Sequence, residues 1–234
     1  MAYYYVKDGG TATGDTGRYT SQKTGAWSSA FTTSPVTDGY YDTLEDCYAA
    51  TTAPTDGDYV CVSHTHAKSY AVGIGNVLLD GDAGPSNTTV GVTVVSVDDS
   101  NVDQYRPGAS EYSTSAYNFR AAGNVASYGV SYRVDGSCFV VLGDKTHVHI
   151  QDGTLQGGTS PEDICWQQTS NSTTARLLNV DMKTDGGTDN VLLLISQGSH
   201  FEWFGGDLTN SPPAFFFHQS TGSSGASIRL DGND

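Results

Sequence analysis

The chain has 234 residues, of which 11 are Lys or Arg and 26 are Asp or Glu, so its formal net charge is −15. This charge repels the phosphate backbone of nucleic acids and anionic membrane surfaces, and neither is an expected partner. With 28 Gly, 14 Tyr and only 2 Met, and without a Pro-rich or charge-rich linker, the composition favours strands and tight turns within one all-β unit.

The first ten residues lack the basic region and apolar run of an export signal. No apolar run approaches the ~18 residues of a membrane span. We therefore expect neither a cleaved signal peptide nor membrane insertion.

A short amphipathic helix is predicted from Thr43. Thr43 can cap the first turn, and Asp46 stands at the capping-box position three residues later. Leu44, Cys47 and Tyr48 form an i, i+3, i+4 apolar stripe. A turn over 53–57 and an apolar strand over 58–63 follow.

The second half of the chain repeats with a period of 26 to 27 residues. The segments 148–150, 175–177, 201–203 and 228–230 each place two apolar residues around a polar one, with starts 27, 26 and 27 residues apart. A second set, 138–142, 164–166, 191–195 and 215–217, keeps nearly the same phase. With Gly-rich turns between them, these strands predict a parallel β-helix, a β-solenoid that winds once per repeat. The alternative is a β-sandwich with accidental periodicity.

The repeat also predicts which side chains are buried. Two inward ladders are expected, one of Val148, Ala175, Phe201 and Ile228 and one of Ile150, Leu177, Trp203 and Leu230. The residues between them, His149, Arg176, Glu202 and Arg229, should point outwards. Cys47, Cys61, Cys138 and Cys165 lie far apart without metal-ligand spacing and are interpreted as small buried hydrophobes.

The start of the chain resembles the opening of right-handed β-helix proteins of the pectate-lyase-like superfold. The matching pieces are Tyr4-Tyr5-Val6, the glycines at 10, 14 and 17, residues 41–44 leading to Ala49-Ala50, and residues 57–62. The resemblance implies a single right-handed parallel β-helix with a short N-terminal capping α-helix. Residues 1–75 would form the entering strand, capping helix and first rung, and 76–234 the coils.

Two features depart from that pattern. The segment 18–39 is long, and Tyr40-Tyr41 stand where the family often has Pro-Phe. We expect the extra segment to decorate the cap.

The opening, the Ser/Thr/Gly-rich coils and the missing export signal together resemble bacteriophage virion proteins that build tailspikes, tail fibres and capsid decorations. The resemblance implies a surface-exposed structural protein of capsid or tail, found in the virion and outside the cell after lysis. It implies three kinds of partner: other virion proteins, further copies of the chain, and host surface polysaccharide. A trimer is one form that the association of copies could take. The alternative is a polysaccharide-degrading enzyme, a glycan lyase or hydrolase of the tailspike type.

The fourth repeat starts at 228–230 and is followed only by residues 231–234. An uncovered last strand would leave unpaired backbone groups over an apolar core. We expect either more chain or another subunit to cover it.

Tyrosines are more numerous than the interior requires. We predict glycan or protein contact for Tyr40, Tyr41, Tyr105, Tyr112 and Tyr117, because exposed tyrosine is frequent at such surfaces. The alternative is packing in the cap and the outer wall.

Acidic residues recur at the strand ends, at Asp152, Asp181, Asp207 and Asp231. Asp commonly accepts backbone N–H bonds where strands bend, so we interpret these as turn residues rather than catalytic ones. The motifs expected of polygalacturonases and pectate lyases, paired Asp-Asp on a strand or clustered Arg-x-x-Arg, do not appear.

Metal ligands are sparse in the sequence. His64 with His66, and His147 with His149, each place two imidazoles on one strand face, but without a third ligand we expect them to face solvent. Turns at 80–82, 98–99 and 185–189 could hold calcium, although none has EF-hand spacing. We expect no cofactor, with Ca²⁺ as the only candidate ion.

Overall fold

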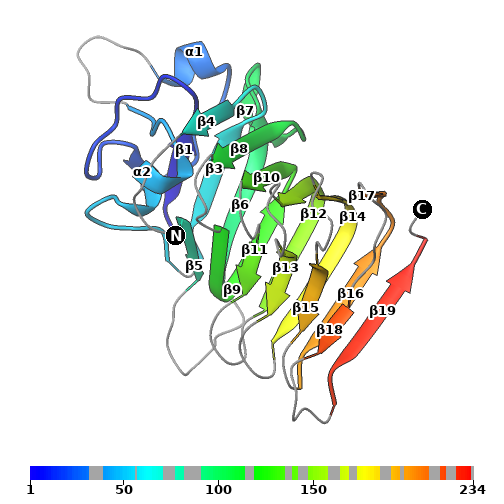
Figure 1. Ribbon diagram of the computed structural model, residues 1–234. Helices are drawn as coiled ribbons and strands as arrows, with labels where there is room; N and C mark the ends of the chain where they lie inside the picture. Colours follow the sequence, from blue (N-terminus) through cyan, green and yellow to red (C-terminus); the bar gives the residue numbers. More distant parts are fainter. Residues whose placement is uncertain are drawn as a thin grey trace.

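The computed structural model describes most of the chain (Figure 1). The described residues are 1–31, 39–55, 57–70, 77–81, 91–113, 119–134, 139–141, 147–157, 164–168, 173–184, 191–195, 198–210, 217–219 and 225–232. They are mostly strand, and the strands are mostly parallel. None of the helices in these ranges is long and apolar enough to cross a membrane.

The predicted helix is present as α2 (Leu44–Tyr48). Thr43 Oγ1 accepts a hydrogen bond from the backbone N–H of Asp46 at 3.0 Å, which confirms the predicted cap. The Thr43 hydroxyl in turn donates to Asp46 Oδ2 at 2.9 Å. Leu44 and Cys47 are completely buried and Tyr48 packs partly buried beside them, so the apolar stripe faces the core.

The parallel strands form three stacks that advance from the N-terminal end to the red end of the chain in Figure 1. Stack 1 consists of β1 (Tyr3–Val6), β3 (Tyr59–Ser63), β6 (Val92–Asp98), the second half of β9 (Phe119–Tyr128), the first halves of β12 (His147–Gly157) and β14 (Thr174–Thr184), β16 (His200–Phe204) and β19 (Ser227–Asp231).

The other two stacks consist of separate strands together with the remaining halves of β9, β12 and β14. Stack 2 consists of β4 (Ala67–Tyr70), β8 (Ala109–Ser113), β10 (Val130–Val134), the second halves of β12 and β14, and β17 (Leu208–Asn210). Stack 3 consists of β5 (Val77–Gly81), the first half of β9, β11 (Phe139–Val141), β13 (Ile164–Gln168), β15 (Val191–Ile195) and β18 (Phe217–Gln219). Two short strands, β2 (Arg18–Tyr19) and β7 (Asn101–Tyr105), pair antiparallel with β1 and β6.

The predicted register of stack 1 is confirmed. The pairs run from Val148 through Ala175 and Phe201 to Ile228, and from Ile150 through Leu177 and Trp203 to Leu230. From β12 to β16 every member of the two ladders is buried, because a strand covers it on either side. On β19 this cover is incomplete, and Leu230 is 46% exposed.

Stack 3 is in part in a different register from the prediction. Aligning the segment starts at residues 138 and 164 would pair Phe139 with Cys165, but Phe139 pairs with Trp166. A shift of one residue exchanges the two faces of a strand. In the observed register the buried Phe139 and Trp166 rings stack 5.0 Å apart at 4°, which explains why it is preferred. Ile164 pairs with Val191, as predicted.

The bend between stack 1 and stack 2 lies at one position in successive strands. Gly129, Asp152, Asn179 and Gly205 all have φ between 52° and 70° there. Gly, Asn and Asp are the residues that tolerate this left-handed conformation best. Asn179 Nδ2 donates to Asp152 Oδ1 at 2.8 Å, and Asp181 Oδ1 accepts from the backbone N–H of Asp207 at 3.0 Å. The predicted turn role is therefore confirmed for Asp152, at the bend itself, and for Asp181 beside it.

All three stacks contribute to one buried core. Its aromatic residues come from stack 1 (Phe201), stack 2 (Tyr132) and stack 3 (Phe119, Phe139 and Trp166), and they touch in sequence at centroid distances of 4.8 to 5.8 Å. Leu44 and Cys47 of α2 belong to the same core, so the helix covers one end of it. Cys47 and Cys61 are free and buried, as expected, whereas Cys138 and the Cys165 side chain lie outside the described part.

A second, smaller cluster covers the outer face of stack 1 at the N-terminal end. Tyr5 and Cys61 point outwards from β1 and β3 and are buried by Trp27 of α1 (Trp27–Ala30) and by Phe31. The rings of Tyr5 and Phe31 lie 4.8 Å apart. This aromatic cover ends at β6 and β7, and beyond it the outer face of stack 1 is open.

Candidate functional site

The outward residues of stack 1 form a column that changes in size along its length. Strand pairing places Tyr3, Tyr59, Thr93, Ala126, His149, Arg176, Glu202 and Arg229 in register. The small side chains of Thr93 and Ala126 lie between the large ones of Tyr59 and His149. This difference in size leaves a hollow across the middle of the sheet face.

The hollow is an open groove of about 810 Å³, here called the stack 1 groove. Met1 and Tyr59 line one end of the groove, and His147, His149, Thr174 and Arg176 line the other. The lining between the two ends consists of Gly57, Gly91, Val92, Thr93, Asn124, Val125, Ala126 and Val148. No Asp or Glu is among these lining residues. The volume lies within the range usual for small-molecule sites.

The floor depends on a glycine. A Cβ added to Gly91 would lie 1.9 Å from the backbone oxygen of Asn124 and 2.4 Å from the Asn124 carbonyl carbon. Backbone cannot yield to that degree, so a side chain at position 91 is excluded without a shift of the strands. The close approach of the two strands keeps the floor flat.

Aromatic rings mark both ends of the groove. At the N-terminal end the Tyr3 and Tyr59 rings stack with centroids 5.5 Å apart and planes at 15°, and Tyr59 is 37% exposed. At the other end the Tyr128 ring lies 5.5 Å from the His149 imidazole. Among these rings Tyr59 is the exposed one, and it offers an apolar face for stacking.

The positive charge at the far end comes from Arg176. Its side chain is 55% exposed, and its Nε lies 3.8 Å from Glu202 Oε2. Glu202 also lies 3.2 Å from His200 Nε2. The guanidinium carbon of Arg176 is 5.5 Å from the Phe204 ring centroid, and that of Arg229 is 5.0 Å from the same ring.

His149 is electrically different from Arg176. Burial lowers the pKa of the His149 imidazole, a hydrogen bond with Gln151 opposes the shift, and the charge of Arg176 adds to it. A lowered pKa leaves the ring neutral at pH 7, able to donate one hydrogen bond and accept another. His147 is exposed on the same strand.

The predicted tyrosines do not gather in this groove. Tyr40 is half-buried against Trp27 and Phe31, at ring distances of 5.3 and 5.5 Å, so it packs in the cap. Tyr41 is completely buried and donates its hydroxyl to the backbone oxygen of Gly14. The expectation that Tyr41 is a surface contact is therefore wrong, because the ring fills the space left by Gly17.

The other predicted tyrosines lie elsewhere. Tyr105 is 46% exposed and donates its hydroxyl to Asp152 Oδ2 at 2.7 Å. Tyr112 is half-buried, with the Arg133 guanidinium 4.3 Å from its ring, beside a smaller groove of about 250 Å³ on stack 2. Tyr117 lies outside the described residues.

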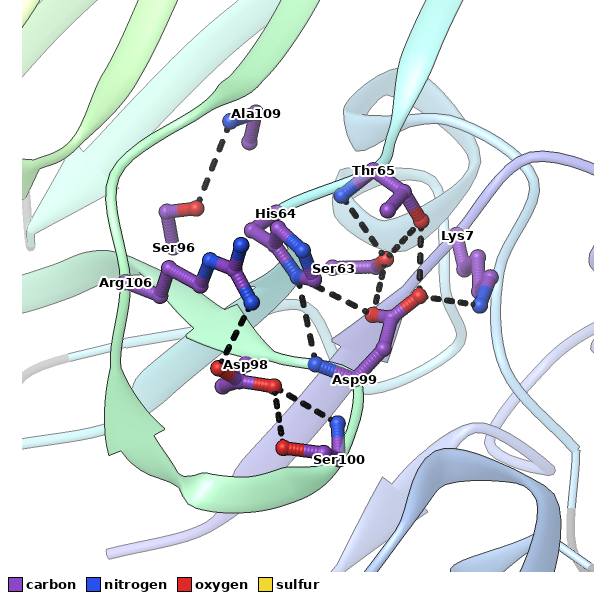
Figure 2. A network of polar contacts seen from close by, with 10 residues as sticks. All are labelled: Lys7, Ser63, His64, Thr65, Ser96, Asp98, Asp99, Ser100, Arg106 and Ala109. Carbon is purple, nitrogen blue, oxygen red and sulfur yellow. Dashed lines mark hydrogen bonds and ion pairs between the residues drawn. The ribbon is translucent and has the colours of Figure 1, made fainter.

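A polar network around Asp99 links the ends of β1, β3 and β6 (Figure 2). Asp99 accepts hydrogen bonds from Lys7 Nζ at 2.6 Å, from Thr65 Oγ1 at 2.7 Å and from the Ser63 hydroxyl. His64 Nδ1 accepts from the Asp99 backbone N–H at 3.1 Å. The Ser63 hydroxyl is bonded to Asp99 and not to His64, so these residues do not have the geometry of a catalytic triad.

His66 was predicted to face solvent, and this prediction is wrong. His66 is completely buried, with Nε2 3.0 Å from Glu111 Oε1. The same Glu111 oxygen accepts from the backbone N–H of Leu44 at 2.6 Å, at the start of α2. His66 Nδ1 and Glu111 Oε2 have no hydrogen-bond partner among the described atoms. His64 and His66 therefore belong to two separate structural networks.

The candidate calcium turns are only partly described. Asp98 accepts from the Ser100 hydroxyl and from Arg106, and Asp99 from Lys7, so that pair is already neutralised by the protein. Residues 82 and 185–189 and the Asp80 side chain lie outside the described part. Within that part, no group of three or more His, Cys, Asp or Glu side chains could hold a metal ion.

The sequence indicates three of the groove residues but not the groove. His147, His149 and Arg176 are predicted to point outwards, whereas Tyr59, Thr93 and Ala126 are not placed beside them. The intervals that link Tyr59, Thr93, Ala126 and His149 are 34, 33 and 23 residues, which the 26 to 27-residue period does not reveal.

Comparison of the chain with protein-family models, with curated proteins and with solved structures gives no match. The fold and the groove geometry are therefore the basis for the proposals that follow.

Proposed function

We propose that the chain is a right-handed parallel β-helix that serves as a surface component of a bacteriophage virion and contacts host surface glycans. The observation that carries the fold proposal is the sharing of one core by three parallel stacks. Consecutive segments of the chain enter the stacks in turn, and the strands that pair in stack 1 from β12 onwards lie 26 or 27 residues apart. A chain that winds once per repeat produces this pattern.

The virion assignment is supported by the resemblance of the opening to β-helix proteins of tailspikes, tail fibres and capsid decorations. The α2 cap over one end of the core fits that opening. The strongly acidic composition suits a protein exposed on a particle, because like charge keeps such particles apart.

A gold-labelled antibody against the purified chain tests the virion assignment. On particles purified from the source of the sequence, we expect regular labelling of capsid or tail, with the chain present in multiple copies by mass spectrometry. Particles that lack the chain in both measurements would contradict the assignment.

The glycan contact is supported by the stack 1 groove, which is open and preformed. Tyr59 borders one end of the groove, and His149, whose ring packs against Tyr128, borders the other. Incubation of the chain with acidic and neutral polysaccharides should leave them intact. New reducing ends or unsaturated products would instead favour the glycan lyase or hydrolase alternative, whose reaction requires bond cleavage.

Association with further copies, with a trimer as one form, is part of the same proposal. Among the described strands β19 pairs only with β16, and its Leu230 is 46% exposed in a ladder that is otherwise buried. Covering such an edge removes unpaired backbone groups and apolar surface from water. Light scattering at micromolar concentration should give a mass of more than one chain, and a stable monomer would contradict this part.

A further inference from the structure

We infer that the stack 1 groove binds an anionic saccharide chain, with a carboxylate of the ligand beside Arg176 and a sugar ring against Tyr59. This inference names the ligand class of the glycan contact and therefore rests on the proposed function. It assigns the contact to the groove residues rather than to the tyrosines predicted from the sequence.

Charge is the first support. The protein carries 26 Asp and Glu residues, yet none is among the described residues that line the groove. The cation among these lining residues is Arg176. A cationic end of the groove attracts an anionic group of a ligand to that end. The acidic charge of the rest of the protein disfavours the binding of polyanions elsewhere on it.

The partners of Arg176 leave it able to bind a ligand. Its nearest carboxylate, Glu202, is 3.8 Å from Nε, which is longer than a hydrogen bond, and 55% of the arginine side chain is exposed. The planar guanidinium presents donors in a fork that matches a carboxylate. Neutral His149 on the adjacent strand can add a hydrogen bond without adding charge.

Shape is the second support. Tyr59 and His149 are separated by three strand-to-strand steps, or about 14 Å at ~4.8 Å for each step. The floor between them consists of the short side chains of Thr93 and Ala126. A ligand that contacts both ends must therefore be extended, and the exposed Tyr59 ring supplies an apolar face for a sugar.

Calorimetric titration of the full chain with defined oligosaccharides tests the ligand class. The anionic probes are hyaluronan hexasaccharide and hexagalacturonate, and the matched neutral probes are the same oligosaccharides with their carboxylates reduced to alcohols. We expect at least one anionic probe to bind about tenfold or more tightly than its reduced form, because a charge-assisted hydrogen bond is lost. Higher salt should narrow the difference.

Matched variants test the location. Arg176→Gln should weaken binding of the anionic probe about tenfold, and Tyr59→Ala should weaken both the anionic and the reduced probes. Arg229→Gln is the control, because Arg229 contacts the same Phe204 ring but is not a groove-lining residue. It should change affinity less than about twofold. Equal melting temperatures of the variants show that the fold is retained.

The outcomes separate this inference from the proposed function. Equal affinity for anionic and reduced probes overturns the anionic ligand but leaves a glycan-binding function intact. Equal loss of affinity in Arg176→Gln and Arg229→Gln overturns the location. If neither charged nor reduced probe binds, the inference is overturned, and antibody labelling of particles still decides the virion assignment independently.

Discussion

At the scale of single residues, burial decides what a substitution costs. Trp203 is 2% exposed, and its indole Nε1 donates to the backbone oxygen of Val180 at 2.8 Å. Trp203→Ala removes a ring from the interior, leaves a cavity and removes the hydrogen bond to the Val180 carbonyl. We expect the free energy of unfolding to fall by about 3 to 5 kcal/mol, measured by denaturant unfolding.

The neighbouring residue is the control for that substitution. Glu202 faces outwards in the same strand and makes only surface contacts with Arg176 and His200. Glu202→Ala should change the free energy of unfolding by less than about 1 kcal/mol. Similar losses in the two variants would mean that inward and outward faces are wrongly assigned.

The buried pair of His66 and Glu111 is a second residue-scale test. Glu111→Ala leaves the imidazole and the Leu44 N–H without their acceptor inside the core. Breaking a buried pair by removing one partner costs about 3 to 5 kcal/mol, and we expect a loss of that size by denaturant unfolding. Lys68→Ala, which removes partly exposed ion pairs with Asp8 and Asp42, should cost at most about 1 kcal/mol. A small loss for Glu111→Ala would show that its burial is overestimated.

At the scale of elements, the capping helix depends on one hydroxyl. Thr43 Oγ1 satisfies the N–H of Asp46, which has no acceptor within the helix. Thr43→Ala should lower the free energy of unfolding by about 1 kcal/mol. Thr43→Ser retains a hydroxyl that can cap the helix, so it should lose much less of that free energy. Amide exchange should quicken in residues 44–48 of the alanine variant, and unchanged exchange there would contradict a capping role.

The strands show how an element is positioned by its neighbours. In stack 1 the alternating pattern of His147 to Ile150 determines the inward face, and the pairing with β14 follows it. In β11, three residues do not define a register by themselves. There the fit of Phe139 against Trp166 decides the pairing, since a slip would place the rings on opposite faces.

At the scale of the whole molecule, acid should destabilise the fold in two steps. Burial lowers the pKa of His149 below its usual 6.5. Burial would raise the pKa of Asp99, but hydrogen bonds from Lys7, Ser63 and Thr65 outweigh it and lower that pKa below 3.8. Groups with lowered pKa values in the folded state stabilise it above their unfolded values, and this stability is lost as pH falls through the folded values.

We therefore expect the free energy of unfolding to decrease slightly below pH 6.5 and more steeply below pH 3.8. Denaturant unfolding across pH 3 to 8 measures both steps. In Asp99→Asn the steep step should be smaller, because one carboxylate no longer takes up a proton on unfolding. A profile that rises towards acid, or is the same in Asp99→Asn, would contradict the assignment.

Part of this architecture could be predicted from the sequence because it depends on local pattern. The cap at Thr43 needs residues three positions apart, and the inward ladders need only alternation within a strand and a period of 26 to 27 residues. The turn role of Asp152 follows from the preference of Asp for bent backbone. These signals all lie within one helix, one strand or one repeat.

The groove and the buried pair depend on contacts between distant segments. His66 looks like a surface residue in sequence, but Glu111, 45 residues later, draws it into the core beneath α2. Tyr41 is buried for a similar reason, since the distant Gly17 leaves room for its ring. Tyr59, Thr93 and Ala126 become neighbours only through irregular intervals between strands. Tertiary structure alone decided these placements, because the lengths of the connections, and not any local pattern, determine which side chains share a face.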